Sequence, residues 1–308
     1  MRLRVLATAV AASALLIAGC SSDSGGSGGD SESITIATTN FSETTLLANM
    51  YQQILESKGV SASIKELTTR EVIIPALESG EIQATPEYLG SFTEFINRQV
   101  NGPDAPQLAT GDAAATYEAA KPLAEQQGIA LLTPSPAQDQ NAFAVTSEFA
   151  KANNLKTLSD LAAYSQTNPV NLGGPPECPQ RPFCQPGLEE TYGMKIASFT
   201  PLDAGGPLTV QALTQGKINV GLVFSSSGSI TSNDLVVLTD DKQLQTAENV
   251  TPALNSAAAS DTVVAALDAV SAALTTEELQ QMNQQIEVDR ANPRKVAEEF
   301  LTSKGLVD

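Results

Sequence analysis

Residues 68–91 constrain the fold of this 308-residue chain more than any other stretch. Thr68 with Glu71 three positions later has the pattern of a capping box, in which side chains satisfy free backbone N–H groups at the start of a helix. Apolar residues follow at helical spacing, and Gly80 stands where a left-handed cap would end the helix. Pro75 either kinks this helix or delays its start, because proline lacks the N–H that a helix interior needs.

A short strand is expected next, over residues 82–85, followed by a loop at 86–91 that contains Tyr88 and Ser91. In an open α/β sheet, ligands bind outside the carboxyl ends of the strands. An aromatic ring that carries a hydroxyl suits the capture of a small molecule at such a place. The loop is therefore a candidate binding site.

These pieces, with others nearer the N-terminus, form a composite pattern that resembles one known family. Its parts are a strand at 34–37, the turn Asn40-Phe41-Ser42-Glu43, the helix with Pro75-Ala76-Leu77 and Gly80-Glu81-Ile82, and the loop Pro86-Glu87-Tyr88-Leu89-Gly90-Ser91. The pattern resembles the extracytoplasmic substrate-binding proteins of ABC importers for osmoprotectants such as glycine betaine, choline and carnitine. The resemblance covers nearly all of residues 34–308. It implies an α/β fold of the two-lobed, type II periplasmic-binding-protein kind, in which each lobe is a sheet flanked by helices and two hinge segments cross between the lobes.

The order of expected elements agrees with that fold. Strand, helix and strand alternate from residue 34 to 85, which favours parallel strands with right-handed crossovers. The Pro- and Gln-rich segment 134–140 is interpreted as the first crossing, and the serine-rich segment 225–229 as the return. Lobe 1 is then expected at 34–138 plus 227–308, with a strand at 235–238 rejoining it, and lobe 2 at 139–226.

The first 19 residues have the pattern of a signal peptide. Arg2 and Arg4 precede an apolar run, and small residues lead to Cys20, as in a lipobox whose thiol becomes lipidated. The alternative is an ordinary signal peptide with an incidental cysteine. Residues 20–33 are rich in Ser, Gly and Asp, which predicts a lipidated cysteine on a flexible tether. We therefore expect the protein outside the cytoplasm, lipid-anchored to the outer face of the cell membrane.

Composition excludes several classes of function. The formal net charge is −18, so binding to nucleic-acid phosphates is not expected. The chain has no histidine, which removes histidine-based triads and histidine metal sites, and no serine has a visible general base beside it. We expect no enzymatic activity, no cofactor and no metal. The chain also lacks Trp, so an aromatic site must be built from Tyr and Phe.

Cys178 and Cys184 lie in a loop with several prolines and glycines, and they are the only cysteines besides Cys20. An exported protein meets an oxidising environment, so a disulfide is predicted. The alternative, a metal pair with C-x5-C spacing, lacks further Cys or His ligands.

The family resemblance implies where the ligand binds. The resembled family binds a ligand carboxylate through an arginine of the second lobe, which matches Arg181, and surrounds a quaternary ammonium with aromatic rings. Tyr88 is retained and Ser91 replaces a threonine, but Asn141, Phe224 and Glu248 stand where the family has tyrosines, and Thr39 stands where it has a lysine. The aromatic cage is thus depleted. Asn40, Asp139 and Asn141 indicate a ligand that forms more hydrogen bonds; Asp139 has two equally weighted roles, attracting a cation or pinning the hinge.

The leading hypothesis is a binding lipoprotein that captures a small zwitterionic or quaternary-ammonium-type solute between two lobes and delivers it to an ABC permease and ATPase. The protein is expected to be a monomer. The alternative is a ligand-sensing lipoprotein, or a binding protein for another zwitterion such as an amino acid derivative, with a role other than transport.

Overall fold

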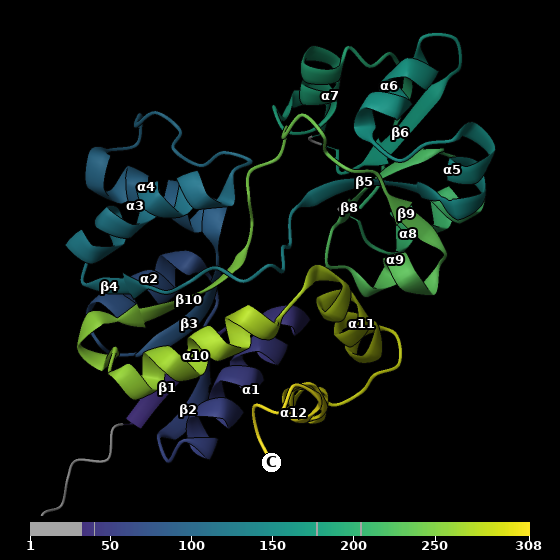
Figure 1. The fold of residues 1–308 in the computed structure, drawn as a ribbon. Coiled ribbons are helices and arrows are strands. Elements are labelled where there is room, and N and C mark those ends of the chain that lie inside the picture. Colours follow the sequence, from purple (N-terminus) through teal and green to yellow (C-terminus); the bar gives the residue numbers. More distant parts are fainter. Residues whose placement is uncertain (1–32, 40, 177, 204) are drawn as a thin grey trace, which may run out of the picture. The chain divides into compact units, whose positions relative to one another are not determined.

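Two five-stranded sheets organise the protein in the computed structural model, which describes residues 33–39, 41–176, 178–203 and 205–308 (Figure 1). The first sheet has the order β2-β1-β3-β10-β4. β1 is parallel to β2 and β3, whereas β10 is antiparallel to both of its neighbours, β3 and β4. The strands are β1 (Ser33–Thr38), β2 (Ser61–Glu66), β3 (Ala84–Tyr88), β4 (Ile129–Leu131) and β10 (Val250–Asn255).

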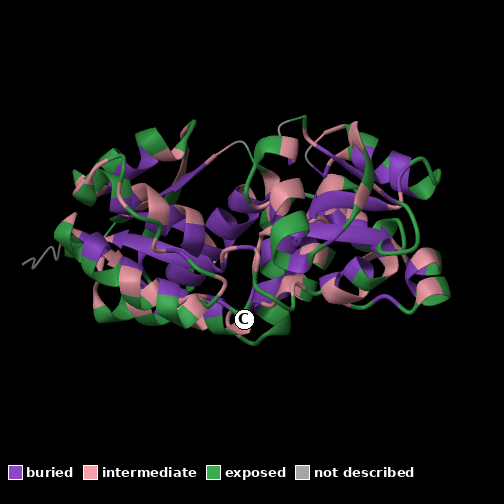
Figure 2. Cartoon of the chain, turned by 90° about the horizontal axis from the view of Figure 1, so that it is seen from above, coloured by how far each residue is buried: buried purple, intermediate pink, exposed green. Residues whose placement is uncertain are grey.

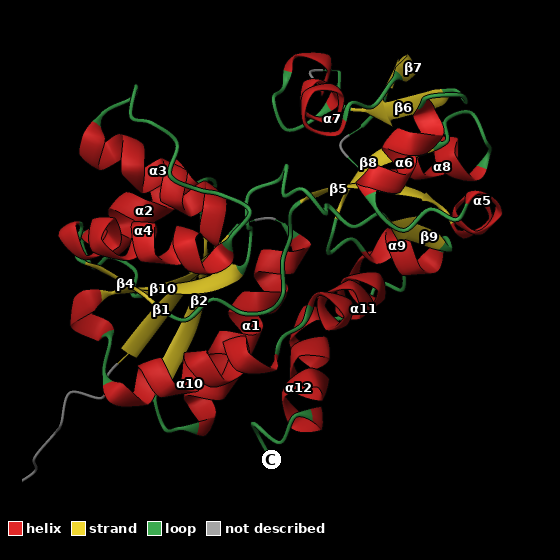
Figure 3. Cartoon of the chain, turned by 45° about the horizontal axis from the view of Figure 1, so that its top comes forward, coloured by secondary structure: helices red, strands yellow, loops and turns green. Residues whose placement is uncertain are grey.

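Helices cover both faces of the first sheet, as the sequence pattern predicts. The apolar residues of α1 (Ser42–Ser57), α10 (Asp261–Ala273), α11 (Thr276–Glu287) and α12 (Pro293–Ser303) form one core with β1. Those of α2 (Arg70–Glu78), α3 (Leu89–Asn101) and α4 (Ala113–Gln126) form a second core on the opposite face (Figure 3). Burial of apolar surface on both faces is the main stabilising contribution of such a layered fold.

The second sheet has the order β7-β6-β8-β5-β9. Its parallel core, β7-β6-β8, is extended by β5 and β9, which run antiparallel to their neighbours. The strands are β5 (Asn141–Thr146), β6 (Val170–Gly174), β7 (Ile196–Pro201), β8 (Val220–Phe224) and β9 (Leu235–Val237). The helices are α5 (Ser147–Asn153), α6 (Leu158–Ser165), α7 (Gln185–Tyr192), α8 (Pro207–Thr214) and α9 (Gly228–Ser232), and a short 3-10 helix, η1 (Cys178–Gln180), precedes α7. A second 3-10 helix, η2 (Ser256–Ala258), follows β10 of the first sheet. Figure 2 shows the central strands of both sheets as buried, whereas the edge strands β2 and β7 contain no buried residue.

The chain crosses between the two sheets at the segment that joins β4 to β5, as expected, and at the segment that joins β9 to β10. The expected return at 225–229 was wrong. β9 pairs with β5 in the second sheet, so the chain returns only after Val237, and residues 227–237 lie with the second lobe rather than the first. The sequence signal was misleading because a serine-rich turn after a strand does not reveal which sheet the next strand joins.

Residues 68–91 fold nearly as expected, with two differences. The helix begins at Arg70, Thr69 occupies the N-cap position, and no side chain caps it, so the capping box at Thr68 was wrong. β3 runs from Ala84 to Tyr88, further along the chain than expected. Pro86 fits in this strand because β1 pairs with β3 only at Ala84, and the missing N–H of Pro86 interrupts no bond on that side.

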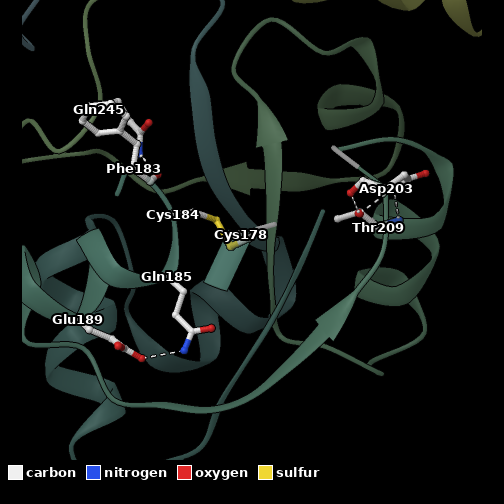
Figure 4. The surroundings of a disulfide bond; sticks show 8 residues. All are labelled: Cys178, Phe183, Cys184, Gln185, Glu189, Asp203, Thr209 and Gln245. Atoms are coloured by element: carbon white, nitrogen blue, oxygen red, sulfur yellow. Dashed lines mark hydrogen bonds between the residues drawn. A yellow bond between two sulfur atoms is a disulfide. The ribbon is translucent and has the colours of Figure 1, made fainter. Parts of the chain in front are cut away.

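No helix among the described residues is long and apolar enough to cross a bilayer. Cys20 and the expected signal peptide and tether lie outside the described residues. The structure places Cys178 and Cys184 in a disulfide, with their Cα atoms 5.2 Å apart (Figure 4).

Candidate functional site

A cavity of about 850 Å³ takes its lining from both lobes and from both crossing segments. It contains five of the residues predicted from the sequence: Tyr88, Ser91, Asp139, Asn141 and Phe224. The first lobe also contributes residues of α2 and α3, and the second contributes Phe183 of the loop between the paired cysteines. The charged, polar and aromatic residues of the lining also include Arg70, Glu94, Arg98, Phe183, Gln245 and Glu248.

Tyr88 ends β3, where the strand gives way to α3, and its ring lines the cavity. Its hydroxyl donates a 2.6 Å hydrogen bond to Oε1 of Glu43, a fully buried carboxyl in the first turn of α1. Oε2 of Glu43 accepts a second bond of 2.6 Å from Nδ2 of Asn283 on α11. This network holds the Tyr88 ring in place before any ligand arrives.

Burial is also the main electrostatic influence on this network. Burial, with the nearby Asp139 carboxylate, raises the pKa of Glu43 to about 8, although the hydrogen bonds from Tyr88 and Asn283 lower it. Burial likewise raises the pKa of Asp139 to about 6, against the hydrogen bond from Ser226. Two carboxyl groups thus lie where water cannot stabilise their charges, one beneath Tyr88 and one in the cavity wall.

Asp139 lies in the first crossing segment, where hydrogen bonds join it to the second lobe and to the other crossing segment. The Ser226 hydroxyl donates to Oδ1 of Asp139 at 2.6 Å, and Asn283 Nδ2 donates to the Ser226 carbonyl at 2.9 Å. The backbone N–H of Asp139 donates to the carbonyl of Glu248 at 3.0 Å, which joins the two crossing segments. Both roles that the sequence suggests for Asp139, attracting a cationic ligand and pinning the hinge, are compatible with this position.

A second polar network forms the wall around Ser91. Arg70 donates to both carboxylate oxygens of Glu87, at 2.7–3.1 Å, and to the Ser91 hydroxyl at 2.9 Å. The Ser91 hydroxyl and backbone N–H both donate to Oε2 of Glu248, at 3.1 and 3.0 Å. Burial raises the pKa of Glu248, while bonds from Ser91 and the charge of Arg70 lower it. Ser91 is therefore fixed between a cation and an anion.

Aromatic rings from both lobes line the same cavity: Tyr88 and Phe95 from the first, Phe183 and Phe224 from the second. Gln245 in the second crossing segment donates to the Phe183 carbonyl at 2.8 Å, close to the disulfide (Figure 4). This bond positions the loop that carries Phe183. A cation between such rings is attracted by their electron-rich faces.

Among the described residues, Arg181 is the one predicted site residue that is not part of the cavity lining. Arg181 is exposed, in the loop between Cys178 and Cys184, and its role as a carboxylate anchor stays a prediction. Asn40 lies outside the described residues. No group of three or more Cys, Asp or Glu side chains in the described part of the chain could hold a metal ion.

Sequence reasoning missed Arg70, Phe183 and Gln245 as site residues. Arg70 carried a signal, since it lies inside the helix motif that supports the family resemblance, next to Glu71. Phe183 lies two positions from Arg181, in the loop between the paired cysteines. Gln245 carried no such signal, because it reaches the cavity only through the segment between β9 and β10, which the sequence did not identify as a crossing.

The fold and the cavity define a class of protein, the two-lobed type II periplasmic binding proteins. The structure superposes on the crystal structure of a glycine betaine/carnitine/choline ABC transporter protein with a TM-score of 0.81 and 23% identity, over 89% of this chain and 100% of the other. It superposes on apo YehZ from Escherichia coli with a TM-score of 0.78 and 28% identity, over 89% and 99% of the two chains.

Residues 32–303 match the family described as the substrate-binding domain of the ABC-type glycine betaine transport system, and the chain belongs to that family. It is 31% identical to the glycine betaine-binding protein YehZ of Escherichia coli strain K12 over 273 residues, which are 85% of this chain and 88% of YehZ. It is 25% identical to a glycine-betaine-binding protein of Pseudomonas aeruginosa over 295 residues, 90% and 89% of the two chains. Members of this family are extracytoplasmic proteins that bind small ligands and deliver them to a permease and ATPase, and they are not enzymes.

Proposed function

We propose that the cavity captures a small quaternary-ammonium-type solute and that the two lobes present it to an ABC permease. The observation that supports this most is the placement of Tyr88. Its ring forms part of the wall, its hydroxyl is fixed by the buried Glu43, and Phe183 and Phe224 line the cavity from the other lobe. Each ring contributes roughly 0.5–2 kcal/mol to the binding of a desolvated cation.

The arrangement also suits a receptor that changes shape on binding. The lining comes from two separately built sheets, so a ligand that contacts both favours their closure about the crossing segments. A ligand with about eight heavy atoms has an affinity ceiling near −12 kcal/mol, which leaves micromolar binding attainable with a partial cage.

Isothermal titration calorimetry with choline, glycine betaine and carnitine tests the proposal. The wild-type protein is expected to bind at least one of them with a dissociation constant in the micromolar range, at about −8 kcal/mol. Tyr88→Ala is expected to weaken that binding at least about tenfold, because a ring of the cage is lost. Tyr88→Phe keeps the ring and serves as the matched control. Absence of binding to all three solutes would contradict the proposal.

We also propose that Cys20 is lipidated and that it tethers a monomeric receptor to the outer face of the cell membrane. The sequence before Cys20 supports lipidation, and diacylation anchors a protein firmly. Mass spectrometry of the mature N-terminus is expected to find a lipid on the Cys20 thiol, which Cys20→Ser removes. An unmodified Cys20 thiol would contradict the lipid anchor. A dimer in light scattering of the protein without its lipid would contradict the monomeric state.

A further inference from the structure

Arg70, one of the two cations that line the cavity, is already paired with one of the chain's own carboxylates. The guanidinium of Arg70 forms three hydrogen bonds with Glu87, whose side chain is only 5% exposed. A bidentate ion pair of this kind is a strong and geometrically fixed contact. Arg70 therefore enters the cavity wall as half of a neutral pair rather than as a binding site for an incoming anion.

Arg98, the other cation of the lining, is exposed on α3. Glu94 precedes it by four residues, so the two side chains lie on the same face of the helix. Glu94 is itself fixed, since its Oε1 accepts the backbone N–H groups of Leu108 and Ala109 at 2.7 Å. The charge of Arg98 is thus screened by solvent, and a carboxylate lies on the same face of the helix.

Four carboxylates line the cavity, and two of them, Glu248 and Asp139, belong to the crossing segments and have no paired cation of this kind among the described residues. Glu248 and Asp139 lie opposite each other on the two crossing segments, next to the antiparallel bridge between Gln138 and Asn249. Residues directly opposite in an antiparallel pair project to the same face. Hydroxyl and N–H groups donate to both carboxylates, but neither forms a salt bridge with a described residue. Arg70 lies close enough to lower the pKa of Glu248, but its hydrogen bonds go to Glu87 and Ser91. A cationic ligand would therefore add a contact that no described cation makes with either carboxylate, and a partly buried carboxylate gains from such a contact.

We propose that Glu248, with Asp139 opposite it, makes the cavity select ammonium ligands with a net positive charge and disfavour those that also carry a carboxylate. This inference rests on the proposed function, since it concerns the same cavity. Glu248 is then a specificity-determining residue: its carboxylate attracts the ammonium and repels an acid group a few bonds away. Choline, which ends in a hydroxyl, meets only the attraction.

Choline and glycine betaine form a matched pair for the test, because both carry a trimethylammonium group and differ in whether a hydroxyl or a carboxylate follows. Two like charges about 6–8 Å apart in a partly buried site repel strongly enough to change a binding constant by about tenfold or more. The wild-type protein is therefore expected to bind choline at least about tenfold more tightly than glycine betaine in calorimetry at low salt.

Glu248→Gln tests the residue itself. Its side-chain oxygen can still accept the bonds from Ser91, so the fold is retained while the charge is lost. The ratio of choline to betaine affinity is expected to fall at least about fivefold. Glu118→Gln, on the exposed surface of α4, makes the same change in net charge away from the cavity and is expected to leave the ratio unchanged.

The possible outcomes separate this inference from the proposed function. If neither solute binds, the proposed function fails. If both bind and betaine binds more tightly, or if Glu248→Gln leaves the ratio unchanged, the charge selection is overturned while the function stands. If Arg181→Ala abolishes the binding of betaine, the charge selection is also overturned. The arginine of the disulfide loop would then supply the counter-charge for the ligand carboxylate.

Discussion

Glu43→Gln is expected to remove most of the pH dependence of stability between pH 5 and 8. The pKa of Glu43 is raised by burial, and by Asp139, from 4.5 to about 8. The folded protein therefore binds this proton more tightly than the unfolded chain does. Its stabilising contribution is fully present below pH 4.5 and is lost as the pH rises through about 8.

The magnitude follows from the same numbers. While folded Glu43 is protonated and unfolded Glu43 is ionised, the free energy of unfolding falls by about 1.4 kcal/mol per pH unit. From pH 5.5 to 7.5 this group alone lowers the free energy of unfolding by about 2–3 kcal/mol. Asp139, with a pKa raised to about 6, contributes in the same direction over the lower part of this range.

Urea denaturation of both proteins at pH 5.5, 6.5 and 7.5 measures this contribution. The glutamine oxygen can still accept the hydrogen bond from Tyr88, whereas its NH2 group cannot accept the bond that Asn283 donates. The loss of that bond lowers the stability of the variant equally at every pH, so the pH dependence still isolates the titrating group. The wild-type free energy of unfolding is expected to decrease across the series by at least about 2 kcal/mol more than that of the variant. Parallel curves, within about 0.5 kcal/mol, would refute the assignment of a proton to buried Glu43.

Three other variants test contacts that stabilise the fold. A Cβ on Gly228 would lie 2.3 Å from the backbone of α11, so Gly228→Ala is expected to cost about 1–3 kcal/mol in urea denaturation; an unchanged midpoint would contradict this contact. Replacing Cys178 and Cys184 by serine is expected to cost about 2 kcal/mol, and an equal loss on adding reductant to the wild type is the control. Arg70→Ala leaves Glu87 buried without its partner and is expected to cost about 3 kcal/mol; a neutral effect would show that the pair is dispensable.

Local sequence patterns were sufficient to predict much of the fold. The apolar stripe of α1, from Leu46 to Leu55, is buried as expected, and Gly59 takes the positive φ of a helix end. Thr275 and Asn292 cap α11 and α12 through their side chains. These features depend on residues three or four apart, for which helical geometry leaves few alternatives.

The parts that sequence could not predict depend on distant contacts. β10 was not foreseen, because its pairing with β3 joins residues more than 160 positions apart. The pairing of β9 with β5 placed the return crossing after the serine-rich segment, in the stretch that carries Gln245 and Glu248. Arg70 and Glu87 form their ion pair only when α2 is packed beside β3. The sequence therefore could not reveal that this cation of the cavity is neutralised.

A crystal structure of the protein with bound choline tests the account most directly. The account predicts that the ammonium lies between the Tyr88 and Phe224 rings, within about 6 Å of their centroids. It also predicts that Glu248 is among the nearest anions to the ammonium. Choline bound outside the cavity lined by the two lobes, or with its ammonium directed away from those rings, would contradict the account.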